Sequence, residues 1–406
     1  MKLNYGKILN AVSTKEVIKI LQEIVRIPSI AGSERKLADF LADRLDKLGF
    51  EVQVINTTKN SPNVLAWLRG SGTGSSLMLN GHIDTPPCSS GWTLKPYEGL
   101  LRDGVVYGHG VLDQKTGIAA QIMAGYALKK SGLKLAGDLC IACVSLHSRP
   151  PGVSTNGTKT IVDRGIRTDY AVVTEPTDFE VGIGNRGIHF IKLIAEGKMA
   201  HTTTPEMGVN AVVKMAKVIL GLDNVKFKPD KVRALTKSLF GGPICYLNIG
   251  PIKGGYENAP PYIPDYCEMT LDVRNMPGKS NKSVLVDIKE VIAQVANSDP
   301  QAKVAVYPED IDPGLKAAWI TPKRHPIVHH LIDAVVEATR AQPKVSFSPG
   351  WTDAGYLVSK GGIPSVVYGP GHEPYYCPDE GIPVSDLMKA TRVYSCLAAR
   401  ICSEEQ

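Results

Sequence analysis

Short apolar segments that alternate with amphipathic segments constrain the fold of the first 180 residues more than any other feature. Three of the apolar segments are SLMLNGHID, LCIACVSLH and YAVVTE, which have the length and residue types of buried strands. Ser13 and Glu16 have the spacing of a capping box, and the apolar residues after them recur at helical spacing. Strands that alternate with helices predict an α/β fold, in which a mostly parallel sheet carries helices on both faces.

A different order of elements begins near Gly187. From there to residue 298 the pattern is strand, helix, strand, strand, helix, which is typical of a ferredoxin-like α+β sandwich. The α/β pattern then resumes. Because 406 residues exceed what a single core usually supports, we predict a discontinuous α/β domain at 1–186 and 299–406 and an inserted domain at 187–298.

Composition narrows the possible partners. The net charge of +6 is small for this length, and no basic stripe is interleaved with aromatic residues, so we expect no nucleic-acid partner. The sequence has no signal-peptide core and no apolar run that could span a bilayer, so we expect a cytoplasmic protein without a membrane partner. Cys140 and Cys143 have CxxC spacing, but an odd spacing on a strand directs them to opposite faces, which favours two core residues.

Polar residues gather where the predicted strands of the α/β domain end. His82 and Asp84 end one strand, Asp113 precedes a helix, and Glu175 ends another strand. Ligands of open α/β sheets bind at the carboxyl ends of the strands. One histidine and two carboxylates are typical ligands of catalytic zinc, and Asp84 could orient the imidazole. Each residue alone is better explained as a strand end or a helix cap, but the four together favour a site.

The sequence resembles the zinc aminoacylase and carboxypeptidase-G-like metallopeptidases, which include acetylornithine deacetylase and succinyl-diaminopimelate desuccinylase. The resemblance rests on segments that occur in the family's order and cover nearly the whole chain: NGHIDTPP, DGVVYGHGVLDQKTG, VVTEPT, GKMAHTTTPEMGVNAV, LDVRNMPG and YGPGHEPYYCPDE. It implies a catalytic domain, an inserted lid and dimerisation domain, and an enzyme that acts on amide bonds.

Carried over to this sequence, the resemblance implies that His82, Asp113 and Glu175 bind a first zinc ion. Asp113 would also bridge to a second zinc ion, and Asp84 would steady His82. The remaining positions implied by the resemblance lie on the substrate side: His201, which reaches the partner's site in family dimers and stabilises an oxyanion, Arg274 for a substrate carboxylate, and Asn258, Gly369 and Gly371.

Three positions depart from the family's pattern. After LCIACVSL the family has two adjacent acids, a general base and a ligand of the second zinc ion, where this chain has Ser148 and Arg149. Near the C-terminus the family has a further histidine ligand, where this chain has Tyr376. Serine is not a base near neutral pH, and arginine stays protonated and does not bind a cation. Ordinary two-zinc hydrolysis should therefore be absent or very weak.

Other residues offer replacements for the missing groups. His147 could serve as the base, because histidine titrates in the right range. Cys377, Ser148 or Tyr376 could form a covalent intermediate with His147 or His372 as its partner. Arg149 could supply a fixed positive charge where the second zinc ion would lie.

We therefore predict an enzyme that acts on a small amide or amino-acid-like carboxylate through one-metal or metal-free chemistry, by hydrolysis, transfer, condensation or cyclisation. Its cofactor would be one zinc or other divalent metal ion, or none, and it would form a homodimer through the inserted domain. Two alternatives remain: a non-catalytic binding or scaffold protein, and an ordinary zinc-dependent deacetylase of N-acyl amino acids.

Overall fold

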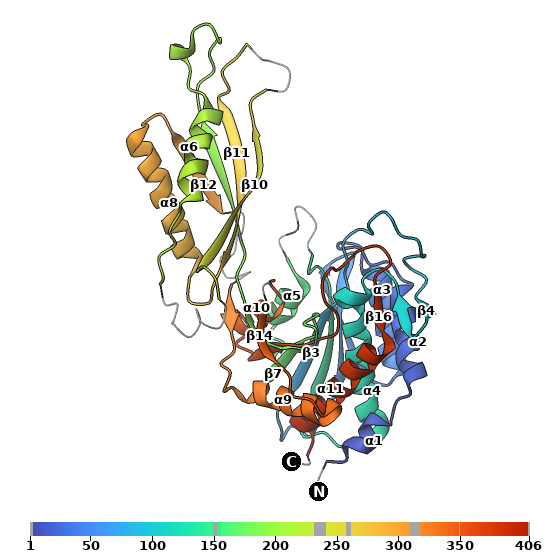
Figure 1. Ribbon diagram of the computed structural model, residues 1–406. Coiled ribbons are helices and arrows are strands. Elements are labelled where there is room, and N and C mark those ends of the chain that lie inside the picture. The colour runs from blue at the N-terminus through green and yellow to red at the C-terminus, as the bar shows by residue number, and fades with distance from the viewer. Residues whose placement is uncertain are drawn as a thin grey trace. The chain divides into compact units, whose positions relative to one another are not determined.

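The computed structural model describes residues 3–148, 153, 155–230, 241–256, 261–308, 317–348 and 350–404. The chain divides into two compact units, whose elements are labelled in Figure 1. The larger unit comprises Met1–Gly184, Ile320–Ser348 and Thr352–Gln406, and the smaller unit comprises Asn185–Trp319 with Pro349–Trp351. Both termini lie at the same end of the larger unit (Figure 1).

The larger unit is built on a nine-stranded sheet. Its strands are β1 (Glu51–Thr58), β2 (Ser61–Leu68), β3 (Leu77–His82), β6 (Leu139–Val144), β7 (Tyr170–Val173), β8 (Val181–Asn185), β13 (Trp319–Ile320), β14 (Val345–Ser348) and β15 (Ser365–Val367). They follow the order β1-β2-β6-β3-β7-β15-β8-β13, with β14 paired to β8. The central strands β6, β3, β7 and β15 are parallel, whereas β1 and β2 join one side as an antiparallel pair.

Helices cover this sheet. They are α1 (Tyr5–Leu9), α2 (Thr14–Val25), α3 (Arg35–Lys47), α4 (Thr116–Ser131), α5 (Gly157–Asp163), α9 (Pro326–Thr339), α10 (Ala354–Ser359) and α11 (Val384–Cys402). The capping box at Ser13 and Glu16 is present at the start of α2. Helix α4 is buried along nearly its whole length because it packs against β3, β6 and α11. The predicted α/β fold with parallel central strands is confirmed.

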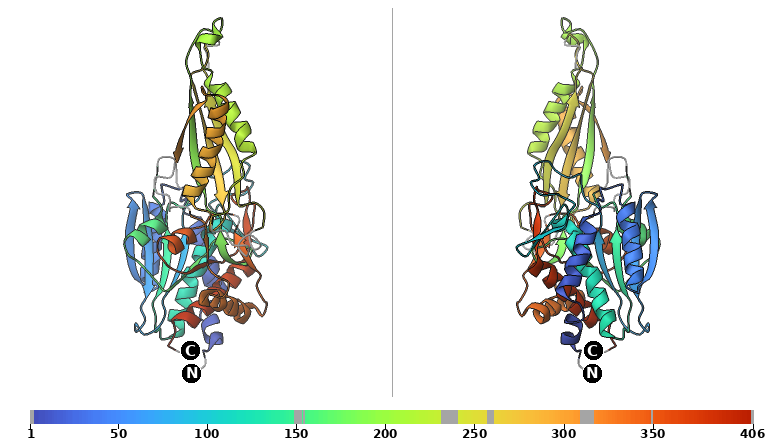
Figure 2. Two further views of the ribbon diagram at one scale, coloured as in Figure 1. Left: turned by 90° about the vertical axis from the view of Figure 1, so that its left-hand side faces the viewer. Right: turned by 90° about the vertical axis from the view of Figure 1, so that its right-hand side faces the viewer.

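The smaller unit has the element order of a ferredoxin-like sandwich. Its elements are β9 (His189–Glu196), α6 (Ala211–Asp223), β10 (Cys245–Gly254), β11 (Tyr266–Asn275), α8 (Asn281–Ser298) and β12 (Lys303–Pro308). The antiparallel sheet has the order β10-β11-β9-β12, and α6 and α8 pack side by side on one of its faces (Figure 2). The sequence-based end of this domain at residue 298 is too early, since β12 pairs with β9 and completes the sheet.

A third, three-stranded sheet belongs to the larger unit. It contains β4 (Leu100–Arg102), β5 (Val105–Tyr107) and β16 (Gly381–Pro383), in the order β16-β5-β4. Two short helical segments are η1 (Val111–Lys115), a π-helix, and η2 (Pro205–Met207), a 3-10 helix. Within the described residues, no helix combines the length and the apolar character that crossing a membrane requires.

Candidate active site

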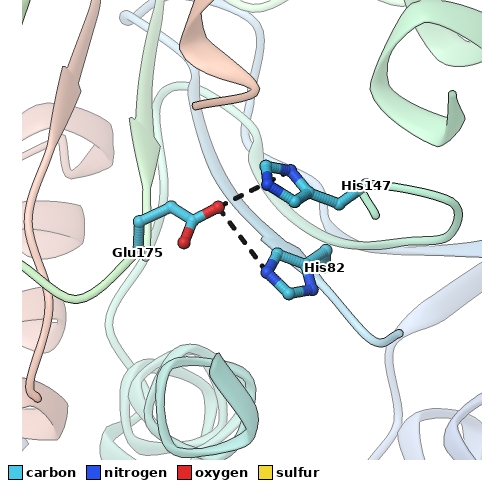
Figure 3. Close-up of side chains that lie close together, drawn as sticks. All are labelled: His82, His147 and Glu175. Atoms are coloured by element: carbon cyan, nitrogen blue, oxygen red, sulfur yellow. Dashed lines mark ion pairs between the residues drawn. The ribbon is translucent and has the colours of Figure 1, made fainter. Parts of the chain in front are cut away.

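Three adjacent parallel strands bring polar side chains together at their carboxyl ends. His82 is the last residue of β3, His147 follows the end of β6, and Glu175 follows the end of β7. Figure 3 shows the rings of His82 and His147 beside the carboxylate of Glu175, and one possible ligand atom from each residue lies within 4.8 Å of the others. The strand order β6-β3-β7 therefore explains why residues that are distant in sequence meet here.

Asp113 reaches the same place from η1, just before α4. Its Oδ1 lies 3.1 Å from His82 Nε2, and Glu175 Oε1 lies 3.6 Å from the same nitrogen. The opposite edge of the His82 ring is fixed, because Nδ1 lies 2.9 Å from the backbone carbonyl oxygen of Asp84. Nδ1 donates to this oxygen in the tautomer that leaves Nε2 as an acceptor. One carboxylate oxygen of Asp113 and one of Glu175 thus both lie close to Nε2 of His82.

Asp84 acts differently from the expectation. Its carboxylate lies 3.8 Å from His82 Nδ1, which is too far for a hydrogen bond. Instead it accepts hydrogen bonds from the backbone N–H groups of His147, at 2.9 Å, and Ser148, at 2.8 Å. The carbonyl of Asp84 orients His82, while its carboxylate holds the turn that carries His147.

Tyr376 occupies the far side of Asp113. Its hydroxyl donates a hydrogen bond to Asp113 Oδ2 at 2.7 Å, while Asp113 Oδ1 faces His82. Burial and the Asp113 charge raise the pKa of Tyr376 well above its usual value, so the hydroxyl keeps its proton. A neutral donor therefore contacts the carboxylate oxygen that is turned away from His82.

His147 is anchored by a residue that the sequence analysis missed. Its Nδ1 lies 3.1 Å from Asp353 Oδ1 and 3.7 Å from Glu175 Oε1. Its ring stacks on that of His82, with 4.4 Å between the ring centroids and 12° between the planes. A metal ion in the plane of one stacked ring would lie off the plane of the other, which disfavours binding of one ion by both rings in this arrangement.

The buried charges of the site oppose one another. Burial and the neighbouring Asp113 raise the pKa of Glu175 to about 8. Burial opposes protonation of His82, but Glu175 and Asp113 outweigh it and raise its pKa. For His147, burial and His82 also oppose protonation, but Asp353 and Glu175 raise its pKa to about 9. A positive charge placed among the carboxylates would lower each of these raised pKa values.

The donor set fits a divalent metal ion. Glu175 Oε1 is buried and makes no hydrogen bond, which is costly for a carboxylate oxygen unless a cation accompanies it. The distances of 3.1 and 3.6 Å from His82 Nε2 suit ligands that each lie about 2.0–2.2 Å from one ion. Imidazole and carboxylate are the ligand types that zinc prefers in catalytic sites.

Comparison with known proteins identifies the family. The model of peptidase family M20/M25/M40 matches residues 78–400. The chain belongs to this M20 family. Its members usually bind divalent metal ions and act on amide bonds, and the chain is accordingly an enzyme of the amidohydrolase and peptidase class.

Individual relatives are distant but align over nearly their full length. The chain is 29% identical to the N-formyl-4-amino-5-aminomethyl-2-methylpyrimidine deformylase of Halalkalibacterium halodurans, over 93% of this chain and 92% of the relative. It is also 29% identical to acetylornithine deacetylase of Proteus mirabilis, over 96% and 97%. The solved structure of aminopeptidase PepT from Bacillus cereus shares the fold, with a TM-score of 0.76 and 20% identity, over 97% of this chain and 100% of that one.

The candidate nucleophiles of residues 372–377 and their histidine partner already make other contacts in this M20 chain. Cys377 Sγ donates to the carbonyl oxygen of Pro374 at 3.5 Å, and His372 Nδ1 lies 2.9 Å from the carbonyl oxygen of Glu373. The raised pKa of Tyr376 makes its hydroxyl a poor nucleophile. None of these observations favours a covalent intermediate.

The residues predicted to lie on the substrate side differ in their contacts. Arg274, in the smaller unit, pairs with Asp272 through Nε at 2.7 Å and Nη2 at 2.8 Å. His201, also in that unit, is exposed, and its Nδ1 lies 2.8 Å from Thr203 Oγ1. A Cβ added to Gly369 would lie 2.6 Å from the Glu175 carbonyl oxygen, so this glycine lets its loop approach Glu175. Gly371 has φ +100, a backbone conformation that favours glycine.

Two predicted residues, Arg149 and Asn258, lie outside the described residues. Ser148 is exposed and contributes its backbone N–H to the Asp84 carboxylate. Glu380 was missed: its carboxylate accepts from the backbone N–H groups of Gly110, at 2.6 Å, and Leu112, at 3.4 Å, and so holds the segment before Asp113.

Proposed function

We propose that this M20 chain hydrolyses a small N-acylated amine or amino acid with one divalent metal ion, zinc or a similar ion, held by His82, Asp113 and Glu175. The observation that carries the proposal is the hydrogen bond from Tyr376 to Asp113 Oδ2, at 2.7 Å. In the two-metal pattern that oxygen would bind a second ion. In this chain, the neutral hydroxyl of Tyr376 keeps its proton and donates to that oxygen. Position 376 therefore supplies no histidine ligand for a second ion.

The relatives' activities support the substrate class. One relative is a deformylase of an N-formyl compound and another an acetylornithine deacetylase, and both names describe removal of a small acyl group. A bound metal ion would polarise the amide carbonyl and acidify a water molecule. The chain's own groups then have to place the substrate and move its protons.

His147 is the group that we expect to move the proton. Its ring stacks on that of His82, its Nδ1 lies 3.7 Å from Glu175 Oε1, and it directly precedes Ser148, which stands where the family has the first of its acids. A positive charge among the carboxylates would lower the raised pKa of His147, and Nε2 of the neutral ring would then accept a proton from the attacking water and return it to the leaving amine. Such general-base assistance is typically worth about 100- to 10,000-fold in rate.

The proposal also assigns roles to two residues of the smaller unit. Arg274 would bind a substrate carboxylate, for which Asp272 would have to share the guanidinium. The chain would form a homodimer through this unit, and His201 of one subunit would serve the partner's site. Exposed apolar residues of α6, Val212, Val213 and Leu220, are consistent with such an interface. Light scattering that finds a stable monomer would contradict this part of the proposal.

The test combines metal analysis with an activity panel. Protein purified without chelator should contain one divalent ion per chain and should release free amine from at least one of a set of N-formyl, N-acetyl and N-succinyl compounds. Chelator should abolish the release, and zinc should restore it. Two tightly bound ions would reinstate ordinary two-zinc chemistry. Full occupancy by one ion without amine release from any compound would favour acyl transfer or a binding role instead.

A further inference from the structure

Asp353 supplies a buried carboxylate to a part of the site that lacks acids in the local sequence. No Asp or Glu lies between Leu139 and Ile161, the stretch that carries His147. Asp353 comes from a segment 206 residues further along the chain and is only 1% exposed. Its Oδ1 lies 3.1 Å from His147 Nδ1. The acid beside His147 therefore comes from a distant segment of the chain rather than from the local sequence.

The Asp353 carboxylate is held on both oxygens. Oδ1 also accepts from Asn156 Nδ2 at 3.1 Å, and Oδ2 accepts from Thr158 Oγ1 at 2.8 Å. Thr158 is fixed in turn, because Asn80 of β3 donates to its hydroxyl at 3.1 Å. Rotation of the carboxylate would break several buried hydrogen bonds at once, so the acceptor facing His147 Nδ1 has a fixed position.

Asp353 does not cap the helix that follows it, although its position suggests that role. It is the N-cap residue of α10, where an aspartate usually accepts a hydrogen bond from a backbone N–H of the first turn. No such bond is present. Both carboxylate oxygens are used instead in the cluster with His147, Asn156 and Thr158, which indicates a role in the site rather than in starting the helix.

We propose that Asp353 is the positioning residue of His147: it fixes the ring against His82 and keeps the ring proton on Nδ1, so that Nε2 is the proton acceptor. An ionised carboxylate only accepts hydrogen bonds, so a ring nitrogen beside it carries the proton. This is how carboxylates behind histidines set the tautomer in other enzymes. The inference deepens the proposed function and rests on it for the role of Nε2, but the tautomer itself does not depend on the activity.

The test uses Asp353→Asn, which keeps the shape and replaces the acceptor by an amide. We expect kcat for amine release to fall about 10- to 100-fold with KM within about twofold, because a positioning residue acts on the reacting group. In a His147→Gln background, Asp353→Asn should cause no further loss, since it acts through His147. Thr158→Val removes the hydroxyl that donates to Asp353 Oδ2 and keeps the Oδ1 acceptor that faces His147, so it is the matched control and should lower kcat by less than Asp353→Asn.

A second measurement separates this inference from the proposed function. Nitrogen NMR of the neutral His147 ring, recorded above its pKa of about 9, should show a proton on Nδ1 alone in the wild type and a shift toward the other tautomer in Asp353→Asn. A wild type that releases amine while Asp353→Asn keeps its kcat, or loses the same factor with and without His147, overturns the inference alone. If the wild type is inactive, the proposed function fails, and a neutral wild-type ring that carries its proton on Nε2 overturns the inference as well.

Discussion

The two units each contain a cluster of buried charges, and the two clusters are built on opposite principles. In the smaller unit, Lys279 is 2% exposed, and its ammonium group lies 2.6 Å from Asp287 Oδ2 and 3.3 Å from Asp230 Oδ1. The cation is part of the chain. In the larger unit, Asp113 and Glu175 face His82, and one oxygen of Glu175 makes no hydrogen bond.

The difference between the two clusters distinguishes a structural ion pair from a candidate functional site. A buried charge that a permanent charge of the chain matches contributes to a single packed state. A buried charge that only titrating groups face is unmatched in this sense, and it depends on protons or on a cation from outside the chain. The Lys279 cluster needs nothing further. The His82 cluster needs a cation or protons, which is why it is the candidate for the metal ion and for catalysis.

The largest expected effect comes from Glu175→Gln, which keeps the shape of the unmatched side chain and removes its charge. Activity should fall about 100- to 10,000-fold, because metal assistance worth several kcal/mol is weakened. The bound metal should fall in parallel, as measured by elemental analysis after gel filtration. Full activity with one retained ion would show that the ion is held elsewhere.

Lys279→Met makes the matched cluster resemble the unmatched one. Asp287 would stay buried without its cation, and breaking a buried pair in this way typically costs about 3–5 kcal/mol. Urea unfolding followed by circular dichroism should report the loss as a lower midpoint. Lys228→Met is the control, since the Lys228 pair with Glu290 is exposed and its loss should change stability by less than about 0.5 kcal/mol. Equal midpoints for the two variants would contradict the comparison.

Tyr376→His tests whether the far side of Asp113 can accept a second ion. Histidine can bind a metal, so the ratio of zinc to protein should rise above one in excess zinc. Tyr376→Phe cannot bind a metal and should stay at one, although it loses a hydrogen bond to a charged group, worth about 1.5–3 kcal/mol. A ratio of two in the unchanged protein, or in Tyr376→Phe, would mean that Tyr376 does not limit the metal count.

The sequence predicted the features that local patterns carry. Buried strands ending in polar residues placed His82 and Glu175 at one edge of the sheet, and helical spacing located α2 and its capping box. The pairs on which the proposed chemistry rests join distant segments: Asp353 meets His147 across 206 residues, and Tyr376 meets Asp113 across 263. In WTDAG, Asp353 has the pattern of a helix N-cap, so no local signal indicates its contact with His147.

The domain boundary was misplaced for a similar reason. The predicted strand-helix-strand-strand-helix order ended at residue 298, but β12 is the edge strand that pairs with β9, more than 100 residues earlier in the chain. Its pairing partner, rather than its own sequence, assigns it to the smaller unit.

The last effect that we predict concerns pH in the metal-free protein. The folded-state pKa of Glu175 is raised from 4.5 to about 8, so between these values the folded chain binds a proton that the unfolded chain releases. Stability must then fall as pH rises through this window. The pKa of His82 is raised as well, and its contribution is also lost as pH rises, so the two groups act in the same direction. Each raised group contributes at most about 1.4 kcal/mol per pH unit.

Melting temperatures of chelator-treated protein between pH 5 and pH 8 measure this slope. Glu175→Gln should flatten it, because the amide does not titrate. Saturating zinc should also flatten or reverse it, since the ion competes with protons for the same carboxylate and imidazole. The Lys279→Met variant serves as the control from the other cluster: its lower stability should leave the slope unchanged, because neither Glu175 nor His82 belongs to its unit. A slope that is the same in the wild type and in Glu175→Gln would mean that Glu175 is not the unmatched charge of this protein.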